Sequence, residues 1–264
     1  MEVKLFPNSR RPGLGLKPRR EAQRPLLPQH SRHCPVLEAG SAMGFLVFPP
    51  LDKQESFLVE FEGDGRYKFT YFLDVPPTGP RALFVVTITL PLGSVGPIRE
   101  DVQFTVAVPP MSAEQARQVA RNLIVIEDIN TPPGAVTLRG ATAFQTPEGW
   151  DTVYSPVLNM IERPMAPMLV IRVETDWYPH ETEFRYVLQP GEGVGGQHHL
   201  PIGQVFFVPR EEITLRDGTE AEMESRRNAK IEFADRKAEQ RVSTPYGMQY
   251  SPHYLKQSRR QSEK

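Results

Sequence analysis

The sequence contains a single cysteine, Cys34, among its 264 residues. One thiol cannot form an intrachain disulfide, so the disulfide-stapled folds of small secreted proteins are excluded. Long apolar runs are also missing, and segments such as Ala82–Val86 are far shorter than the roughly 20 residues that cross a bilayer. The first residues lack the apolar stretch of a signal peptide. We therefore expect a cytoplasmic protein without a membrane span.

Several motifs of common enzyme classes are absent as well. No Gly-x-Ser-x-Gly nucleophile elbow occurs, and the glycine-rich segment 191–196 lacks the Lys-Ser/Thr ending of a phosphate-binding loop. His33 precedes Cys34 and could activate its thiol, but a cysteine buried at the start of a strand is the simpler interpretation. The sequence favours a non-enzymatic protein and leaves the question of catalysis open.

The sequence is unusually rich in proline, and its charges are unevenly distributed along the chain. The 27 prolines are about twice the number that average usage of roughly 5% would give. Residues 1–33 carry a net charge of +6, residues 34–209 carry −9 and residues 210–264 carry +2. Such a basic segment can bind an acidic surface, or it can simply be a solvated tail. It has no aromatic interleaving beyond Phe6, so we do not expect nucleic-acid binding.

Alternating apolar and polar residues predict many short strands. The segment 62–66 contains Asp-Gly, a tight-turn signal, between the alternating segments 57–61 and 67–72. Ser112 and Gln115 have the spacing of a capping box and predict one short helix. Further strands are predicted at 45–48, 83–90, 102–108, 136–139, 153–158, 168–175, 183–188 and 204–208. The pattern predicts a mainly β fold, an antiparallel β-sandwich or jelly roll.

Composition divides the chain into four parts. We expect an extended, basic, proline-rich arm at 1–33, a β-sandwich domain at 34–210, a charged helix at 211–243 and an extended tail at 244–264. The helix is predicted from favourable i, i+4 pairs of opposite charge. Both ends hold too few apolar residues to form a core by themselves, so they are expected to dock on something.

Short motifs between residues 131 and 192 carry a resemblance to a known family. They are Thr131-Pro132-Pro133-Gly134, Leu138-Arg139-Gly140, Val173-Glu174-Thr175-Asp176-Trp177 and Pro190-Gly191-Glu192, with a weaker match at Cys34-Pro35-Val36-Leu37 and Gly44-Phe45. In these motifs the chain resembles DUF6065, an uncharacterised bacterial and phage family, over roughly residues 34–210. The resemblance implies a β-rich fold and supplies no activity and no catalytic residues. It also implies, as the alternative to a cytoplasmic protein, a part of a phage or similar particle assembly.

Two carboxylates and two tryptophans are candidate binding residues. Glu174 and Asp176 are two apart on a predicted strand, so both should face the same way and could bind a cation or share acid–base work. The alternative is a solvated pair, or one paired with Arg172. Trp177 and Trp150 are expected to pack at the rim of the core, or to form a binding platform if they line a cleft.

Three histidines are candidate metal ligands. His198 and His199, with His180 upstream, could supply nitrogens to a divalent metal ion such as iron or zinc, and the residues that follow are weakly similar to a cupin motif. Adjacent histidines on a strand point to opposite faces, however, so a polar loop at 193–199 is the plainer interpretation.

The first functional hypothesis is a non-enzymatic binding or assembly protein with no cofactor. Residues 1–33 and 211–264 would dock on protein partners in a larger complex, either different proteins or further copies of the chain. The second hypothesis is a cupin-like metal-dependent enzyme or metal-binding protein that uses the three histidines with Glu174 or Asp176.

Overall fold

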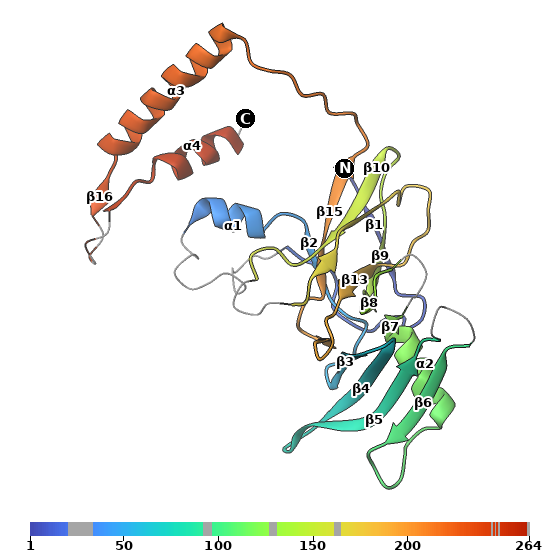
Figure 1. Cartoon of the computed structure of the whole chain (residues 1–264). Helices are drawn as coiled ribbons and strands as arrows, with labels where there is room; N and C mark the ends of the chain where they lie inside the picture. Colours follow the sequence, from blue (N-terminus) through green and yellow to red (C-terminus); the bar gives the residue numbers. More distant parts are fainter. Residues whose placement is uncertain are drawn as a thin grey trace. The chain divides into compact units, whose positions relative to one another are not determined.

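Strands dominate the computed structural model of the chain, which confirms the predicted mainly β character (Figure 1). The structure describes residues 1–20, 34–91, 97–126, 131–160, 165–243, 245, 247 and 249–262. These residues form two compact units: residues 1–211, here called the body, and residues 212–264, here called the C-terminal unit.

An antiparallel five-stranded sheet forms one part of the body. The turn predicted at 62–66 joins two of its strands, and Asp64 and Gly65 there have φ angles of 48° and 71°, as the Asp-Gly signal requires. The strand order is β14 (Gly193–Gln197), β3 (Glu55–Gly63), β4 (Arg66–Val75), β5 (Gly79–Thr89) and β6 (Arg99–Phe104).

Three smaller antiparallel sheets make up the rest of the body. One has the order β12 (Ile171–Val173), β10 (Trp150–Ser155), β15 (Gly203–Pro209) and β2 (Phe45–Val47). Another has the order β11 (Met168–Leu169), β13 (Glu183–Val187), β8 (Ala135–Arg139) and β7 (Ile124–Val125). The third pairs β1 (Lys4–Pro7) with β9 (Thr142–Gln145).

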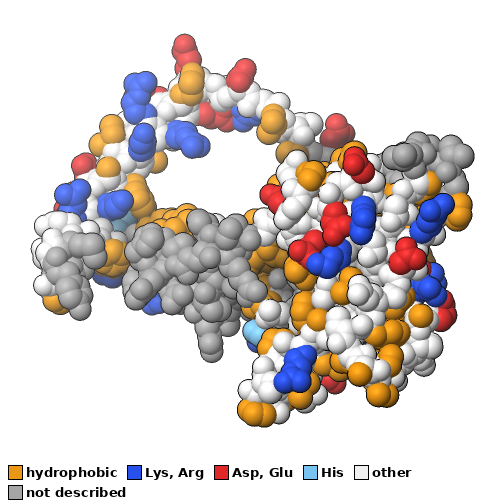
Figure 2. All heavy atoms as spheres, turned by 60° about the horizontal axis from the view of Figure 1, so that its bottom comes forward, with side chains coloured by type: hydrophobic (Ala, Val, Ile, Leu, Met, Phe, Trp, Pro, Cys, Tyr) orange, Lys and Arg blue, Asp and Glu red, His pale blue; other side chains and the backbone are white. Residues whose placement is uncertain are grey.

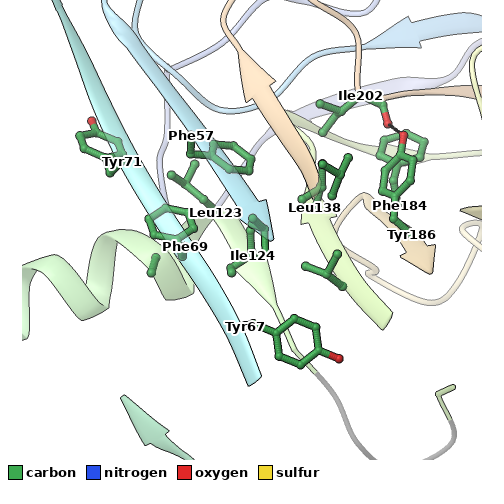
Figure 3. Close-up of a cluster of buried hydrophobic side chains, with 14 of the residues drawn as sticks. Phe57, Tyr67, Phe69, Tyr71, Leu123, Ile124, Leu138, Phe184, Tyr186 and Ile202 are labelled. Carbon is green, nitrogen blue, oxygen red and sulfur yellow. Dashed lines mark hydrogen bonds between the residues drawn. The ribbon is translucent and has the colours of Figure 1, made fainter. Parts of the chain in front are cut away.

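The main hydrophobic core contains buried side chains from all four of these sheets, and a smaller cluster lies around Leu46, Phe48 and Val157. Helix α2 (Ala113–Leu123) lies against the five-stranded sheet and buries Ala116, Ala120 and Leu123 (Figure 1). Its predicted capping box is present, with Ser112 accepting from the main chain of Gln115. Figure 3 shows aromatic rings of β3 and β4 beside the end of α2, and the hydroxyl of Tyr186 donating to the carbonyl oxygen of Ile202.

Two segments of the body differ from the prediction. Residues 35–41 form helix α1 (Pro35–Ser41) rather than a strand, because a proline fits the first turn of a helix, where its missing N–H is not needed. Residues 193–197 form strand β14 rather than a polar loop. A Cβ atom at Gly195 would lie 2.4 Å from the carbonyl oxygen of Phe57, so only glycine lets this strand approach β3.

Part of the predicted N-terminal arm belongs to the body. Strand β1 pairs with β9, and Asn8 is fully buried, its side chain donating a 2.9 Å hydrogen bond to the main chain of the body. Arg11 donates two hydrogen bonds, of 2.7 and 2.9 Å, to the carboxylate of Glu55. The N-terminal segment therefore contacts the rest of the body as far as Arg19, which forms a β-bridge with Leu46 of β2. Residues 21–33 lie outside the described residues.

The C-terminal unit is helical, with one short strand pair. Of the charged helix predicted at 211–243, the structure has helix α3 (Glu220–Glu239), while residues 211–219 are not helical. Strand β16 (Val242–Ser243) pairs with β17 (Gln249–Tyr250). The tail was predicted to be extended, but it contains helix α4 (His253–Ser262), which begins directly after Pro252 and so escapes the helix-breaking effect of that proline. Among the described residues, no helix is long and apolar enough to cross a membrane.

Candidate functional site

An open pocket, here called the aromatic pocket, lies between the N-terminal segment, β9 and the loop 174–181. Strand β1 brings Phe6 opposite Ala143 of β9, and the loop closes the other side. The pocket has a volume of about 350 Å³. Its lining residues are Phe6, Pro7, Ser9, Ala143, Phe144, Gln145, Thr175, Trp177, Tyr178, Pro179, His180 and Glu181.

Buried hydroxyl groups fix the start of the loop. The hydroxyl of Thr146 donates to the carbonyl oxygen of Trp150 at 2.6 Å and lies 2.9 Å from the hydroxyl of Thr175. Because Thr146 has used its only proton, Thr175 donates to Thr146 and accepts from Thr152, at 2.7 Å. This chain of hydrogen bonds ties the loop to β10.

An ionic network lies at the base of the loop. The carboxylate of Asp151 accepts hydrogen bonds from Arg172 and from Arg210, both at 2.6 Å, and only 2% of its side chain is exposed. Arg210 also donates to Asp176 at 2.8 Å. The hydrogen bonds from Arg210 lower the pKa of Asp151 and that of Asp176, so both carboxylates stay ionised at neutral pH.

This network changes the interpretation of the predicted carboxylate pair. Strand β12 ends at Val173, so Glu174 and Asp176 lie in a turn, and strand alternation does not apply to them. Arg172 pairs with Asp151 and not with Glu174 as the sequence suggested. Glu174 is exposed and accepts a 2.7 Å hydrogen bond from the indole N–H of Trp177. The two carboxylates thus position the loop.

The two tryptophans have different surroundings. Trp177 lines the aromatic pocket with 67% of its surface exposed, in contact with Tyr178 at 5.8 Å between ring centroids. Trp150 is half-buried at the start of β10, opposite Pro209, and is not among the residues that line the pocket. Of the two, Trp177 has the position that a binding platform requires.

The three histidines are not brought together as one set of ligands. His180 lines the aromatic pocket, whereas His198 and His199 lie in the turn that follows β14. Within the described parts of the chain, no three His, Cys, Asp or Glu side chains are grouped as metal ligands would be. The metal-binding alternative stays a prediction without a site in this structure.

His180 is instead held by aromatic rings. Its ring stacks on Tyr178 at 5.5 Å and meets the edge of Tyr154 at 5.9 Å. Burial lowers the pKa of His180, so the ring is neutral at pH 7. Nε2 of His180 and Oε2 of Glu181 are both buried, and neither has a hydrogen-bond partner among the described residues.

Several residues of this site were not predicted. Phe6 belongs to a segment expected to be an arm, and Arg210 was placed at the boundary of the β domain; neither lies in a recognisable motif. Tyr178 and Glu181 lie within two positions of the predicted His180, and this proximity is the sequence feature that could have pointed to them.

Comparisons with protein-family models, with curated proteins and with solved structures found no match to this chain, so the resemblance to DUF6065 stays a prediction.

Proposed function

We propose that this chain is a non-enzymatic assembly protein whose C-terminal unit docks on the body of a second copy. The observation that carries the proposal is helix α3, which is 20 residues long and buries none of them. Met223 and Ile231 are 55% and 54% exposed on it. Figure 2 shows hydrophobic side chains between charged ones along this unit. A capped helix that leaves its apolar side chains in water is typical of an element that packs on a partner.

Charge supports a second copy as the partner. Helix α4 carries Lys256, Arg259 and Arg260 and no acidic residue. The segment 34–209, which holds most of the body, has a net charge of −9. A basic helix and an acidic body attract each other, and two copies of one chain supply both surfaces. Since residues 4–19 are engaged with their own body, the C-terminal unit is the better candidate for the docking element.

The oligomeric state tests the proposal. Sedimentation velocity of the full chain over a wide concentration range should show a species with at least twice the mass of one chain. Ile231→Asp places a carboxylate in the proposed interface and should weaken self-association by about tenfold or more. Ile231→Leu is the matched control, because it keeps an apolar side chain at the same position and should leave association unchanged.

Two results would contradict this assignment. One is a full chain that stays monomeric at the highest concentration reached. The other is an Ile231→Asp variant that associates as tightly as the parent chain, since the interface would then exclude the face of α3 on which Ile231 lies.

A further inference from the structure

The aromatic pocket combines an aromatic wall with buried acceptors that lack partners. Trp177, Tyr178 and Phe6 are 67%, 48% and 48% exposed, which is unusual for three neighbouring rings on one surface. Oε2 of Glu181 and Nε2 of His180 are without hydrogen bonds among the described residues. A buried polar atom without a partner costs free energy, so the pocket is incomplete as a purely structural feature.

We propose that the aromatic pocket binds a primary ammonium group, either of a small amine or of a lysine side chain. The assignment is independent of self-association through the C-terminal unit. Self-association does not need such a ligand, so the amine site would be a second function of the chain.

Glu181 supplies the charge. Its Oε1 accepts a 3.2 Å hydrogen bond from the main-chain N–H of Ser9, which holds the carboxylate at the edge of the pocket. Its second oxygen is left for a donor from the ligand. An ammonium ion supplies the opposite charge and the N–H groups, and hydrogen bonds between charged groups are about twice as strong as those between neutral ones.

His180 supplies a second acceptor. The ring is neutral, so one of its two nitrogens carries a lone pair that can accept an N–H. Two acceptors on consecutive residues of the pocket lining favour a ligand with at least two N–H donors, which a primary ammonium has and an alcohol lacks. Arg185 and Arg139 are the cations near His180, and the charge of Arg139 is balanced by Glu183 at 2.8 Å.

The aromatic rings favour a cation over an anion. Their faces carry partial negative charge and attract an ammonium within about 6 Å of the ring centre. The rings also offer apolar area to the methylene chain of a lysine or an alkylamine. An anionic ligand would meet Glu181 and the ring faces, and both would repel it.

A nuclear magnetic resonance titration of the full chain provides the test. The chain has two tryptophans, so its spectrum holds two indole N–H signals. With n-butylamine hydrochloride or Nα-acetyl-lysine amide as the ligand, the Trp177 signal should shift and the Trp150 signal should not. The matched neutral ligand is n-butanol, which should cause no saturable shift. Tighter binding of the lysine derivative would indicate a lysine side chain as the natural ligand, and tighter binding of the alkylamine a small amine.

Three variants locate the interaction. Glu181→Gln removes the charge and should weaken amine binding by roughly tenfold or more. Glu148→Gln is its control, because Glu148 is exposed and does not line the pocket. Trp177→Leu keeps apolar area without a π face and should weaken binding about two- to fivefold. For this variant the shifts of main-chain amides in 175–181 replace the lost indole signal as the readout.

The proposal is overturned by any of three outcomes. The first is the absence of a saturable shift with either amine at concentrations where the chain stays folded. The second is equal binding of n-butanol and n-butylamine. The third is a folded Glu181→Gln variant that binds the amines as tightly as the parent chain does.

Discussion

At the scale of single residues, contacts between distant positions hold the loop 174–181. Arg210 reaches Asp151 and Asp176, which are 59 and 34 positions away in the sequence. The motif that contains Trp177 could be identified from the sequence because its residues are consecutive. The residues that pair with the motif could not be identified, because pairing between strands depends on the strand order, and no local sequence pattern encodes that order.

Replacing Thr175 tests the hydroxyl chain beneath the pocket. Thr175→Val keeps the shape of the side chain but leaves the hydroxyls of Thr146 and Thr152 without their partner in a buried position. We expect the free energy of unfolding to fall by about 1–3 kcal/mol, measured by urea denaturation. Thr175→Ser retains the hydroxyl and should lose less. A Thr175→Val variant as stable as the parent chain would show that this hydroxyl contributes nothing to stability.

His180 predicts a pH dependence of stability. Burial lowers its pKa in the folded chain below the 6.5 of an unfolded one, so the unfolded state binds the proton more readily. The contribution of His180 to stability is complete above pH 6.5 and is lost as the pH falls toward its folded pKa, with a slope of at most about 1.4 kcal/mol per pH unit. His180→Gln should flatten the curve just below pH 6.5. An unchanged curve in His180→Gln would contradict the assignment.

At the scale of elements, local signals predicted some segments well. The capping box of α2 and the Asp-Gly turn between β3 and β4 are short-range features, and both are confirmed. Strand β14 was missed because its sequence, Gly-Val-Gly-Gly-Gln, has almost no strand propensity. What makes it a strand is the main chain of β3 beside it, which only a tertiary structure reveals.

Gly195 is a direct test of that explanation. Gly195→Ala brings a Cβ atom against the carbonyl oxygen of Phe57, and a main-chain atom cannot move aside cheaply. We expect a loss of about 1–3 kcal/mol in the free energy of unfolding. Gly40→Ala, in helix α1, has its nearest contact at 3.6 Å and should be neutral or slightly stabilising. Similar losses in both variants would mean that the close approach of β14 to β3 is not the cause.

At the scale of the whole molecule, the two ends of the chain have different relations to the body. Both ends were predicted to be docking elements, from their charge and proline content. Composition could not tell that residues 4–7 complete a sheet of their own body, because the partner strand is some 140 residues downstream. The jelly-roll or sandwich arrangement likewise stays a prediction, while the antiparallel sheets are established.

Truncations should separate the two ends. At concentrations below those at which the full chain self-associates, a chain ending at Glu211 should retain the melting temperature of the body, because the C-terminal unit is a separate compact unit. A chain that starts at residue 21 should melt much lower, since it loses β1 and the hydrogen bonds of Asn8 and Arg11, each worth about 1 kcal/mol net. Scanning calorimetry measures both. Equal melting temperatures in the two truncated chains would contradict this distinction.

Strand β1 also has a consequence for the order of events during synthesis. Lys4 is made about 140 residues before its partner Gln145, a delay of roughly 7–30 s at 5–20 residues per second. During that time the first segment has no strand to pair with, and one wall of the aromatic pocket does not exist. The pocket is therefore assembled on the nascent chain only after β9 and the loop 174–181 have emerged.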